Sequence, residues 1–209
     1  MKKSEASQAI GIANLDRIKC LINKKETDHE RWSKPLNYST DNWDYRLPIC
    51  LEFISGSSSI IDFGCGNTKL KSFLPEGTFY QPIDLVARTS QTLIIDGNTE
   101  EWYKKIPEKQ ETLAAIGVIE YIHDFKNFIY NASLCADKIL ITYHLSHSFV
   151  SDTKKEESNI MRLSNGWLSD FNIKDFLDAI EEAKCRLLNF HCFPLKKYYQ
   201  EITLLISSN

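Results

Sequence analysis

Short apolar runs alternate with helical segments through the middle of this 209-residue sequence, and no other feature limits the fold as strongly. The runs lie at residues 59–63, 78–84, 92–96, 112–118 and 137–144. Three segments with helical patterns lie between them, NTKLKSFL, NTEEWYKKI and EYIHDFKNFIYNASLCA. Apolar strands separated by helices are typical of a parallel sheet covered on both faces. Only LVARTSQ separates the second run from the third, which is too short for a crossover helix and predicts a loop or a single turn.

The carboxyl-terminal part of the sequence adds a helix and a hairpin. The helix is expected over FNIKDFLDAIEEAK, with Ser169 or Asp170 as its cap. Two further apolar runs, CRLLNFHCF and EITLLISS, are joined only by PLKKYYQ, so at least one of these strands is antiparallel. The expected architecture is an α/β three-layer sandwich. It has a mainly parallel seven-stranded sheet, an antiparallel C-terminal hairpin and an N-terminal helical cap.

One domain of residues 1–209 accommodates these elements. Its expected parts are an N-terminal helical cap (1–55), a core (56–144), a variable excursion (145–168) and a C-terminal helix and hairpin (169–209). The charge run DTKKEES indicates that the excursion is exposed and flexible. In the cap, Asp41 or Asn42 is expected to start a helix through WDYRLPICLEFI, with Pro48 in its first turn or at a kink.

Composition excludes several classes of function. The formal net charge is −3 and no basic stripe occurs, so nucleic-acid binding by phosphate neutralisation is not expected. Six cysteines are scattered without a CxxC pair, so a reduced chain without a metal site is expected. The N-terminus lacks the apolar core of a signal peptide, and no apolar run approaches the ~20 residues that cross a membrane. The prediction is a soluble, cytoplasmic protein.

The stretch IIDFGCGNTKL, residues 60–70, places two glycines between an apolar run and the start of a helix. Turns of this kind let a ligand contact the backbone directly. A dinucleotide site needs a third glycine, and Lys69 occupies that position. Asp62, two residues before Gly64, is an unfavourable neighbour for a pyrophosphate. A carboxylate there suits a ligand that carries positive charge.

Two more carboxylates end neighbouring apolar runs. Asp84 ends the second run, where a parallel strand would deliver a carboxylate to a ribose diol. Asp96 ends the third run and precedes Gly97, which lets the backbone approach a flat ring. Together with Asp62 they describe a nucleoside pocket for a cationic ligand without phosphates. S-adenosylmethionine has these properties.

These residues resemble the motifs of the class I S-adenosylmethionine-dependent methyltransferases of small-molecule type. IIDFGCGNTKL is similar to the first motif of that family, an apolar pair followed by D-x-G-x-G. Asp84 is similar to its acidic residue after the second strand, and Asp96-Gly97 to its adenine-side motif. GVIEYIHD at 117–124 resembles the V-L-E-H-I-x-D segment after the fourth strand, and GWLSDFNIKDFLDAIEEAKCRLLNF resembles the last helix and sixth strand.

The resemblance covers about residues 56–145 and implies a Rossmann-like fold. The sequence departs from the family pattern at Thr68, where a third glycine is common, and at Thr112, where an acidic residue is common. It also lacks a helix after Asp84.

The expected cofactor is S-adenosyl-L-methionine, and ten residues are expected to bind it: Asp62, Gly64, Cys65, Gly66, Asp84, Asp96, Gly97, Gly117, Val118 and Arg46. Each has a structural alternative. The glycines suit a simple turn, Asp62 a cap of the loop amides, Asp84 a surface position, and Cys65 a small gap in the packing. Arg46, with Tyr38, Trp43 and Tyr45, either covers the cofactor or forms the packing face of a helix.

A hydroxyl acceptor needs a general base, and His144 is the first candidate because it follows the fifth apolar run. Tyr121 and His123 are the reserves. The predicted reaction is methyl transfer to an oxygen or nitrogen of a small molecule, for which a sugar or glycan precursor is one candidate. The alternatives are a degenerate fold that binds cofactor or a partner without chemistry and, less favoured, an NAD-dependent enzyme. Segments 30–50 and 145–168 are expected to converge over the strand ends.

Overall fold

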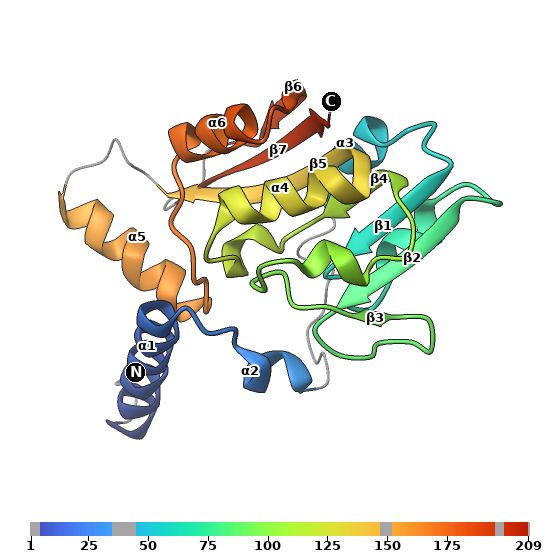
Figure 1. Cartoon of the computed structure of the whole chain (residues 1–209). Helices are drawn as coiled ribbons and strands as arrows, with labels where there is room; N and C mark the ends of the chain where they lie inside the picture. Colours follow the sequence, from blue (N-terminus) through green and yellow to red (C-terminus); the bar gives the residue numbers. More distant parts are fainter. Residues whose placement is uncertain (1–4, 35–44, 147–151, 195–198, 209) are drawn as a thin grey trace.

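A seven-stranded sheet forms the centre of the protein (Figure 1). This computed structural model describes residues 5–34, 45–146, 152–194 and 199–208. The strands are β1 (Ser59–Phe63), β2 (Phe79–Asp84), β3 (Leu93–Ile94), β4 (Gln110–Ala115), β5 (Ala136–Ser146), β6 (Arg186–Cys192) and β7 (Tyr199–Ser207). Their order is β3-β2-β1-β4-β5-β7-β6. Strand β7 is antiparallel to β5 and β6, and the other neighbouring pairs are parallel. The mainly parallel sheet with an antiparallel C-terminal hairpin is therefore confirmed.

The strand order reverses between β1 and β4. From β1 the chain adds β2 and β3 toward one edge, and from β4 it adds β5 toward the other. In open α/β sheets, ligands bind outside the carboxyl ends of the strands at such a reversal. Strand β1 ends at Phe63, directly before the two glycines, and β4 ends at Ala115, two residues before Gly117. The fold thus brings two glycine-containing loops to the reversal point.

Helices cover both faces of the sheet and confirm the three-layer sandwich. One face carries α4 (Phe125–Cys135), α6 (Ile173–Glu182) and the 3-10 helix η3 (Trp102–Lys105), and α4 and α6 lie side by side (Figure 1). The other face carries α3 (Leu47–Phe53) and the 3-10 helix η2 (Lys69–Phe73). Successive strand residues serve opposite faces, so Ile61 packs in the first core and Ile60 in the second. Each large apolar side chain buried there stabilises the fold by about 1.5–3 kcal/mol.

Three further α-helices lie beyond the carboxyl ends of the strands, α1 (Glu5–Lys24), α2 (His29–Ser33) and α5 (Asp152–Ser164) (Figure 1). The 3-10 helix η4 (Ile119–Tyr121) follows β4 and packs into the first core through Ile119. Helix α1 packs on α5 through Ile18 and Leu163, with Leu168 completing the cluster (Figure 1). The charge run DTKKEES therefore belongs to helix α5, whereas the sequence predicted a flexible, exposed excursion. Packing against α1 explains the difference, because tertiary contacts override a polar composition.

The local predictions have mixed outcomes. Pro48 lies in the first turn of α3, as expected, and no helix separates β2 from β3. The predicted N-cap of α6 was wrong. Asn172, rather than Ser169 or Asp170, accepts hydrogen bonds from the amides of Lys174 and Asp175. Ser169 does not cap the helix because its hydroxyl donates a hydrogen bond to the carbonyl of Ile119 instead.

The expected caps Asp41 and Asn42 lie outside the described residues. None of the described helices is long and apolar enough to cross a membrane.

Candidate active site

The turn after β1 exposes bare backbone at the reversal point. Gly64 and Gly66 have φ of +74° and +50°, angles that favour glycine. The amides of Gly64 and Cys65 donate to the carbonyl of Ile83 at 2.8 and 2.9 Å and tie the turn to β2. A Cβ atom at Gly64 would lie 2.3 Å from Cγ2 of Val118. The first glycine is therefore required by its backbone angle and by the close approach of the loop after β4.

Thr68, which departs from the family pattern, also has a left-handed backbone, with φ of +58°. Its amide donates to the carbonyl of Cys65 at 2.7 Å, and η2 begins at the next residue. The turn thus keeps at this position a conformation that favours glycine, although a β-branched residue occupies it.

The side chain of Asp84 fixes the glycine turn by a hydrogen bond to its backbone. Its side chain is buried, with 8% exposure, and Oδ2 accepts a hydrogen bond from the amide of Gly66 at 2.9 Å. Oδ1 lies 3.4 Å from Nε of Arg88. Arg88 also donates to the carbonyl of Trp32 at 2.9 Å. Arg88 was not among the predicted site residues, although its i+4 spacing from Asp84 was a signal in the sequence.

Asp62 occupies the least solvated acidic position near the turn. It is 5% exposed, and the hydroxyl of Tyr80 donates to its carboxylate. Burial raises the pKa of Asp62 to about 7, and the nearby carboxylate of Asp84 acts in the same direction. A neighbouring positive charge would favour the ionised form of this group.

Asp96 and Gly97 serve the packing of the N-terminal segment as well as the site. The Asp96 carboxylate accepts from the Thr27 hydroxyl at 3.0 Å and from the amide of Asn98 at 2.9 Å, and His29 lies 3.4 Å away. A Cβ at Gly97 would come within 2.9 Å of Ile122. Asp96 and Gly97 therefore form a structural turn and also line the first cavity, so both interpretations of this pair remain compatible with the structure.

Two cavities meet at the glycine turn. The first, of about 160 Å³, lies over the ends of β1, β2 and β3, and the second, of about 430 Å³, lies toward β4 and β5. Both are lined by Trp32, Gly64, Gly66, Gly117 and Tyr121. The first also contains Asp84, Asp96, Gly97 and Val118, and the second contains Arg46, Asp62, Cys65 and His144. All ten predicted cofactor residues therefore line one continuous region.

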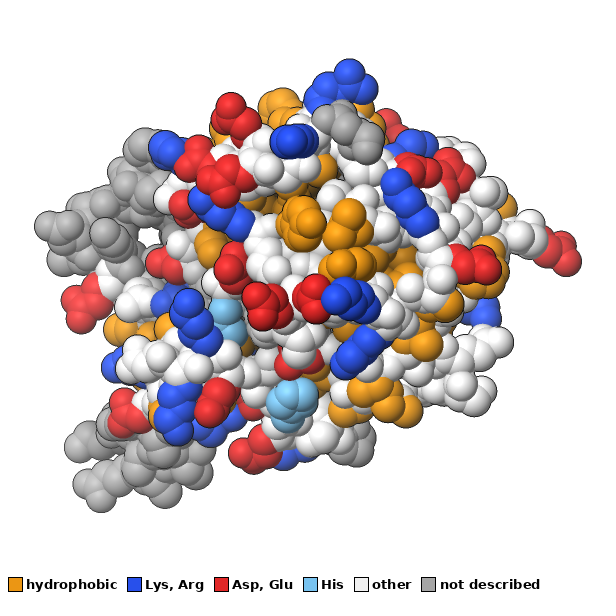
Figure 2. All heavy atoms as spheres, in the orientation of Figure 1, with side chains coloured by type: hydrophobic (Ala, Val, Ile, Leu, Met, Phe, Trp, Pro, Cys, Tyr) orange, Lys and Arg blue, Asp and Glu red, His pale blue; other side chains and the backbone are white. Residues whose placement is uncertain are grey.

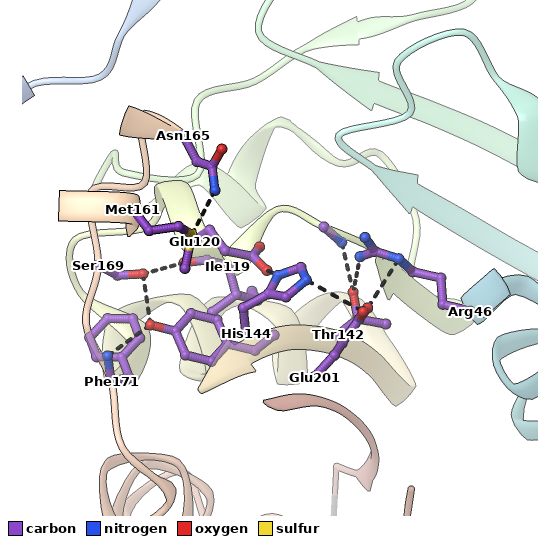
Figure 3. A network of polar contacts seen from close by, with 12 residues as sticks. Arg46, Ile119, Glu120, Thr142, His144, Met161, Asn165, Ser169, Phe171 and Glu201 are labelled. Carbon is purple, nitrogen blue, oxygen red and sulfur yellow. Dashed lines mark hydrogen bonds and ion pairs between the residues drawn. The ribbon is translucent and has the colours of Figure 1, made fainter. Parts of the chain in front are cut away.

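A buried network of charged side chains forms one wall of the second cavity (Figure 3). Nε of Arg46 lies 3.1 Å from Oε1 of Glu201, and Arg46 donates to the Thr142 hydroxyl at 3.0 Å. The same hydroxyl accepts from the amide of Gly117 at 2.8 Å. The hydroxyl of Tyr45 donates to Glu201. Arg46 is therefore positioned by β5 and β7 together.

His144 belongs to this network. Its Nδ1 lies 2.6 Å from Oε1 of Glu120, and its Nε2 lies 3.4 Å from Oε2 of Glu201. The imidazole stacks on the ring of Trp167, with centroids 4.6 Å apart. Glu201 and Trp167 were not among the predicted site residues. Glu201 offered one signal, an acidic residue at the start of an apolar strand.

The N-terminal segment and the end of α5 converge over the cavities. Nη1 of Arg31 donates to the carbonyl of Asn165 at 2.7 Å, and a Cβ at Gly166 would lie only 1.8 Å from that nitrogen. Trp32 packs edge-on against Tyr121, with ring centroids 4.8 Å apart. The convergence expected from the sequence is present in the described residues.

The reserve candidates lie differently. Tyr121 lines both cavities, whereas His123 lies outside their linings. The amide of His123 donates to Oδ1 of Asn98 at 2.8 Å, and its Nε2 lies 3.0 Å from the carbonyl of Glu26. His123 thus joins the N-terminal segment to the core. Tyr38 and Trp43 lie outside the described residues, and among the described residues no group of three or more His, Cys, Asp or Glu could hold a metal ion.

Solved structures share this fold. Magnesium protoporphyrin IX methyltransferase from Synechocystis, with bound S-adenosylhomocysteine, aligns with a TM-score of 0.57 at 12% identity over 81% of this chain and 83% of its own. A SAM-dependent methyltransferase from Archaeoglobus fulgidus aligns with a TM-score of 0.60 at 12% identity over 81% and 94%. The cyclase SpnF aligns with a TM-score of 0.60 at 8% identity over 84% of both chains. No family model and no curated protein sequence matches this chain.

The chain therefore has the fold of the class I S-adenosylmethionine-dependent methyltransferases, as the sequence motifs predicted. At these identities the likeness establishes the fold alone. A fold can host several chemistries, so the function has to be argued from the site.

Proposed function

We propose that this protein binds S-adenosylmethionine and transfers its methyl group to an oxygen or nitrogen of a small molecule. The observation that carries the proposal is the meeting of two cavities at the glycine turn, with Asp84 beside one and Asp62 beside the other. A cofactor with a ribose at one end and positive charge at the other matches that distribution of carboxylates.

The residues present fit this cofactor. Asp84 offers carboxylate oxygens to the ribose hydroxyls, and Gly97 offers bare backbone beside the apolar side chains of Ile95 and Ile122 for the adenine. Asp62 suits the ammonium or the sulfonium. Arg46 and the amides of the glycine turn suit the carboxylate of the methionine part.

S-adenosylmethionine supplies an activated methyl group, so the chain has to align the acceptor and exclude water. Trp32, Tyr121 and Trp167 provide aromatic walls in the second cavity. The hydrogen bond from Arg31 to the carbonyl of Asn165 joins two further residues that line this cavity. Alignment of this kind contributes several kcal/mol to the lowering of a barrier.

A small-molecule acceptor suits the charge of the molecule. The formal net charge is −3, and acidic and basic side chains are interspersed over the face seen in Figure 2. Nucleic acids bind to concentrated positive charge. A hydroxyl-bearing acceptor such as a sugar or glycan precursor fits the proposal, and the cytoplasm is its expected location.

A cofactor-binding module without chemistry is the second candidate. The specific observation in its favour is that both ring nitrogens of His144 face carboxylates, which leaves the first candidate base already engaged. An NAD-dependent enzyme is less favoured, because Lys69 stands at the third glycine position and Asp62 and Asp84 flank the turn.

The test is methyl transfer itself. The protein is incubated with S-adenosylmethionine labelled in the methyl group and a panel of small hydroxyl and amine compounds, and both products are measured by mass spectrometry. The expected result is stoichiometric release of S-adenosylhomocysteine and a labelled acceptor, with slower transfer by Asp84→Ala at subsaturating cofactor as the control. Tight binding without transfer to any compound would support the binding module instead.

A further inference from the structure

Glu120 has a carboxylate oxygen that nothing in the described structure satisfies. This residue lies in η4, is 2% exposed and lines the second cavity. Its Oε1 lies 2.6 Å from Nδ1 of His144, whereas its Oε2 is buried and has no hydrogen-bond partner among the described residues. Buried carboxylate oxygens without a partner are costly and uncommon. Since Glu120 lines the second cavity, a donor bound in that cavity can supply the missing hydrogen bond to Oε2.

The surroundings hold Glu120 in place. Its backbone carbonyl accepts from the amides of Leu168 and Ser169 at 2.7 and 3.0 Å. His144 is in turn fixed between Glu120 and Glu201 and by stacking on Trp167 (Figure 3). The network therefore orients one oxygen of Glu120 toward His144 and leaves the other for a ligand. Such support is what a reacting group needs.

Glu201, the other carboxylate beside His144, is engaged elsewhere. Its oxygens face Nε of Arg46 and the hydroxyl of Tyr45, and Glu201 does not line either cavity. Both ring nitrogens of His144 face carboxylates. Within the wall of the second cavity, Glu120 is thus the group of this network with an oxygen left to accept a proton.

We propose that Oε2 of Glu120 accepts a hydrogen bond, and then the proton, from the nucleophilic O–H or N–H of the methyl acceptor. This assignment rests on the proposed function. As the bond from oxygen or nitrogen to the methyl carbon forms, the carbon–sulfur bond breaks and its electron pair stays on sulfur. The proton passes to Glu120, which becomes neutral and later returns it to water. His144 is a positioning residue that holds the other oxygen.

The proposed role of Glu120 restricts the chemical class of the methyl acceptor. An ionised carboxylate only accepts hydrogen bonds, so the acceptor has to carry a proton on its nucleophilic atom. Tyr121, Trp32 and Trp167 line the same cavity and favour a flat ring. An aromatic hydroxyl or amine combines both properties.

Phenol and anisole form a matched pair of probes, because anisole is phenol with the proton replaced by a methyl group. Their affinities are measured by ligand-observed NMR on the protein saturated with S-adenosylhomocysteine. The wild-type protein is expected to prefer phenol by about tenfold or more, as for a hydrogen bond to a charged group. Glu120→Gln places an amide donor near the cavity and should abolish that preference. Glu182→Gln, which removes an exposed carboxylate on α6, should keep it.

The positioning role of His144 is tested by separate variants. His144→Phe removes the donor to Glu120 and should weaken the preference, and His144→Asn, which retains an N–H, should restore part of it. If Glu120→Gln fails to fold, Glu120→Asp replaces it, since the shorter carboxylate should also lose the preference. A wild-type protein that does not distinguish the probes, or a Glu120 variant that still does, would overturn the assignment. Failure to bind S-adenosylhomocysteine would instead overturn the proposed function.

Discussion

At the scale of single residues, Asp62 links the protonation state of the site to cofactor binding. Burial raises its pKa to about 7, so the ionised fraction rises from about a tenth at pH 6 to about nine-tenths at pH 8. A cationic ligand needs the ionised form, so affinity falls as pH falls through 7. We predict that S-adenosylmethionine binds about tenfold more tightly at pH 8 than at pH 6.

Calorimetric titration across this range measures the effect of Asp62. Asp62→Asn, which keeps the size of the side chain and cannot ionise, should bind more weakly at pH 8 and lose this pH dependence. Identical pH profiles for the two proteins would show that Asp62 does not contact the positive part of the cofactor.

Asp84 is expected to contribute directly to the affinity for the ribose. Replacing Asp84 with Ala should weaken S-adenosylmethionine binding by about 1–3 kcal/mol, because charge-assisted hydrogen bonds are lost. The variant also releases the amide of Gly66 and the side chain of Arg88, so its thermal stability has to be measured in parallel. Unchanged affinity in a folded variant would remove Asp84 from the cofactor site.

The contact between Gly64 and Val118 can be tested by a double-mutant cycle. Gly64→Ala places a Cβ 2.3 Å from Cγ2 of Val118 at a φ of +74°, so we expect the free energy of unfolding to fall by about 1–3 kcal/mol. Adding Val118→Ala should recover part of that loss in urea unfolding. Strictly additive effects would contradict a direct contact and leave only the backbone angle as the cause.

At the scale of secondary-structure elements, α2 and the turn after α5 form the cover of the site. Arg31 joins them by its hydrogen bond to the carbonyl of Asn165 and lies over the rings of Trp32 and Tyr121. We predict that Arg31→Ala speeds hydrogen exchange of the amides in both elements and leaves the central strands unchanged. Lys34→Ala, an exposed change next to the same helix, is the control. Equal exchange in Arg31→Ala and the wild type would mean that other contacts hold the cover.

Helices and strands could be predicted from the sequence where a local pattern of apolar residues determines them. Apolar runs such as SIIDF and DKILITYH locate strands, and the short LVARTSQ link excluded a helix. The pattern failed for α5, whose helical state depends on packing against α1, and for the cap at Asn172, because Ser169 bonds to a distant carbonyl. These features depend on contacts between residues far apart in the sequence.

At the scale of the whole molecule, one part of the site is decided by local sequence patterns and the other by contacts between distant residues. The glycine turn and the carboxylates Asp62 and Asp84 follow from motifs within strand ends, so the sequence predicted that they meet. The network of Arg46, Glu120 and Glu201, the last two linked through His144, joins distant parts of the chain, and only the folded sheet brings them together. Glu120 lies in GVIEYIHD, which marked it as a residue near the site, but that segment does not indicate its pairing with His144.

We propose that the region around the glycine turn binds S-adenosylmethionine rather than a dinucleotide. Calorimetric titration of the full chain with S-adenosylmethionine, S-adenosylhomocysteine and NAD tests it most directly. We predict saturable binding of S-adenosylmethionine and S-adenosylhomocysteine with one ligand per chain, and no binding of NAD at the same concentrations. Binding of NAD alone, or of none of the three, would contradict it.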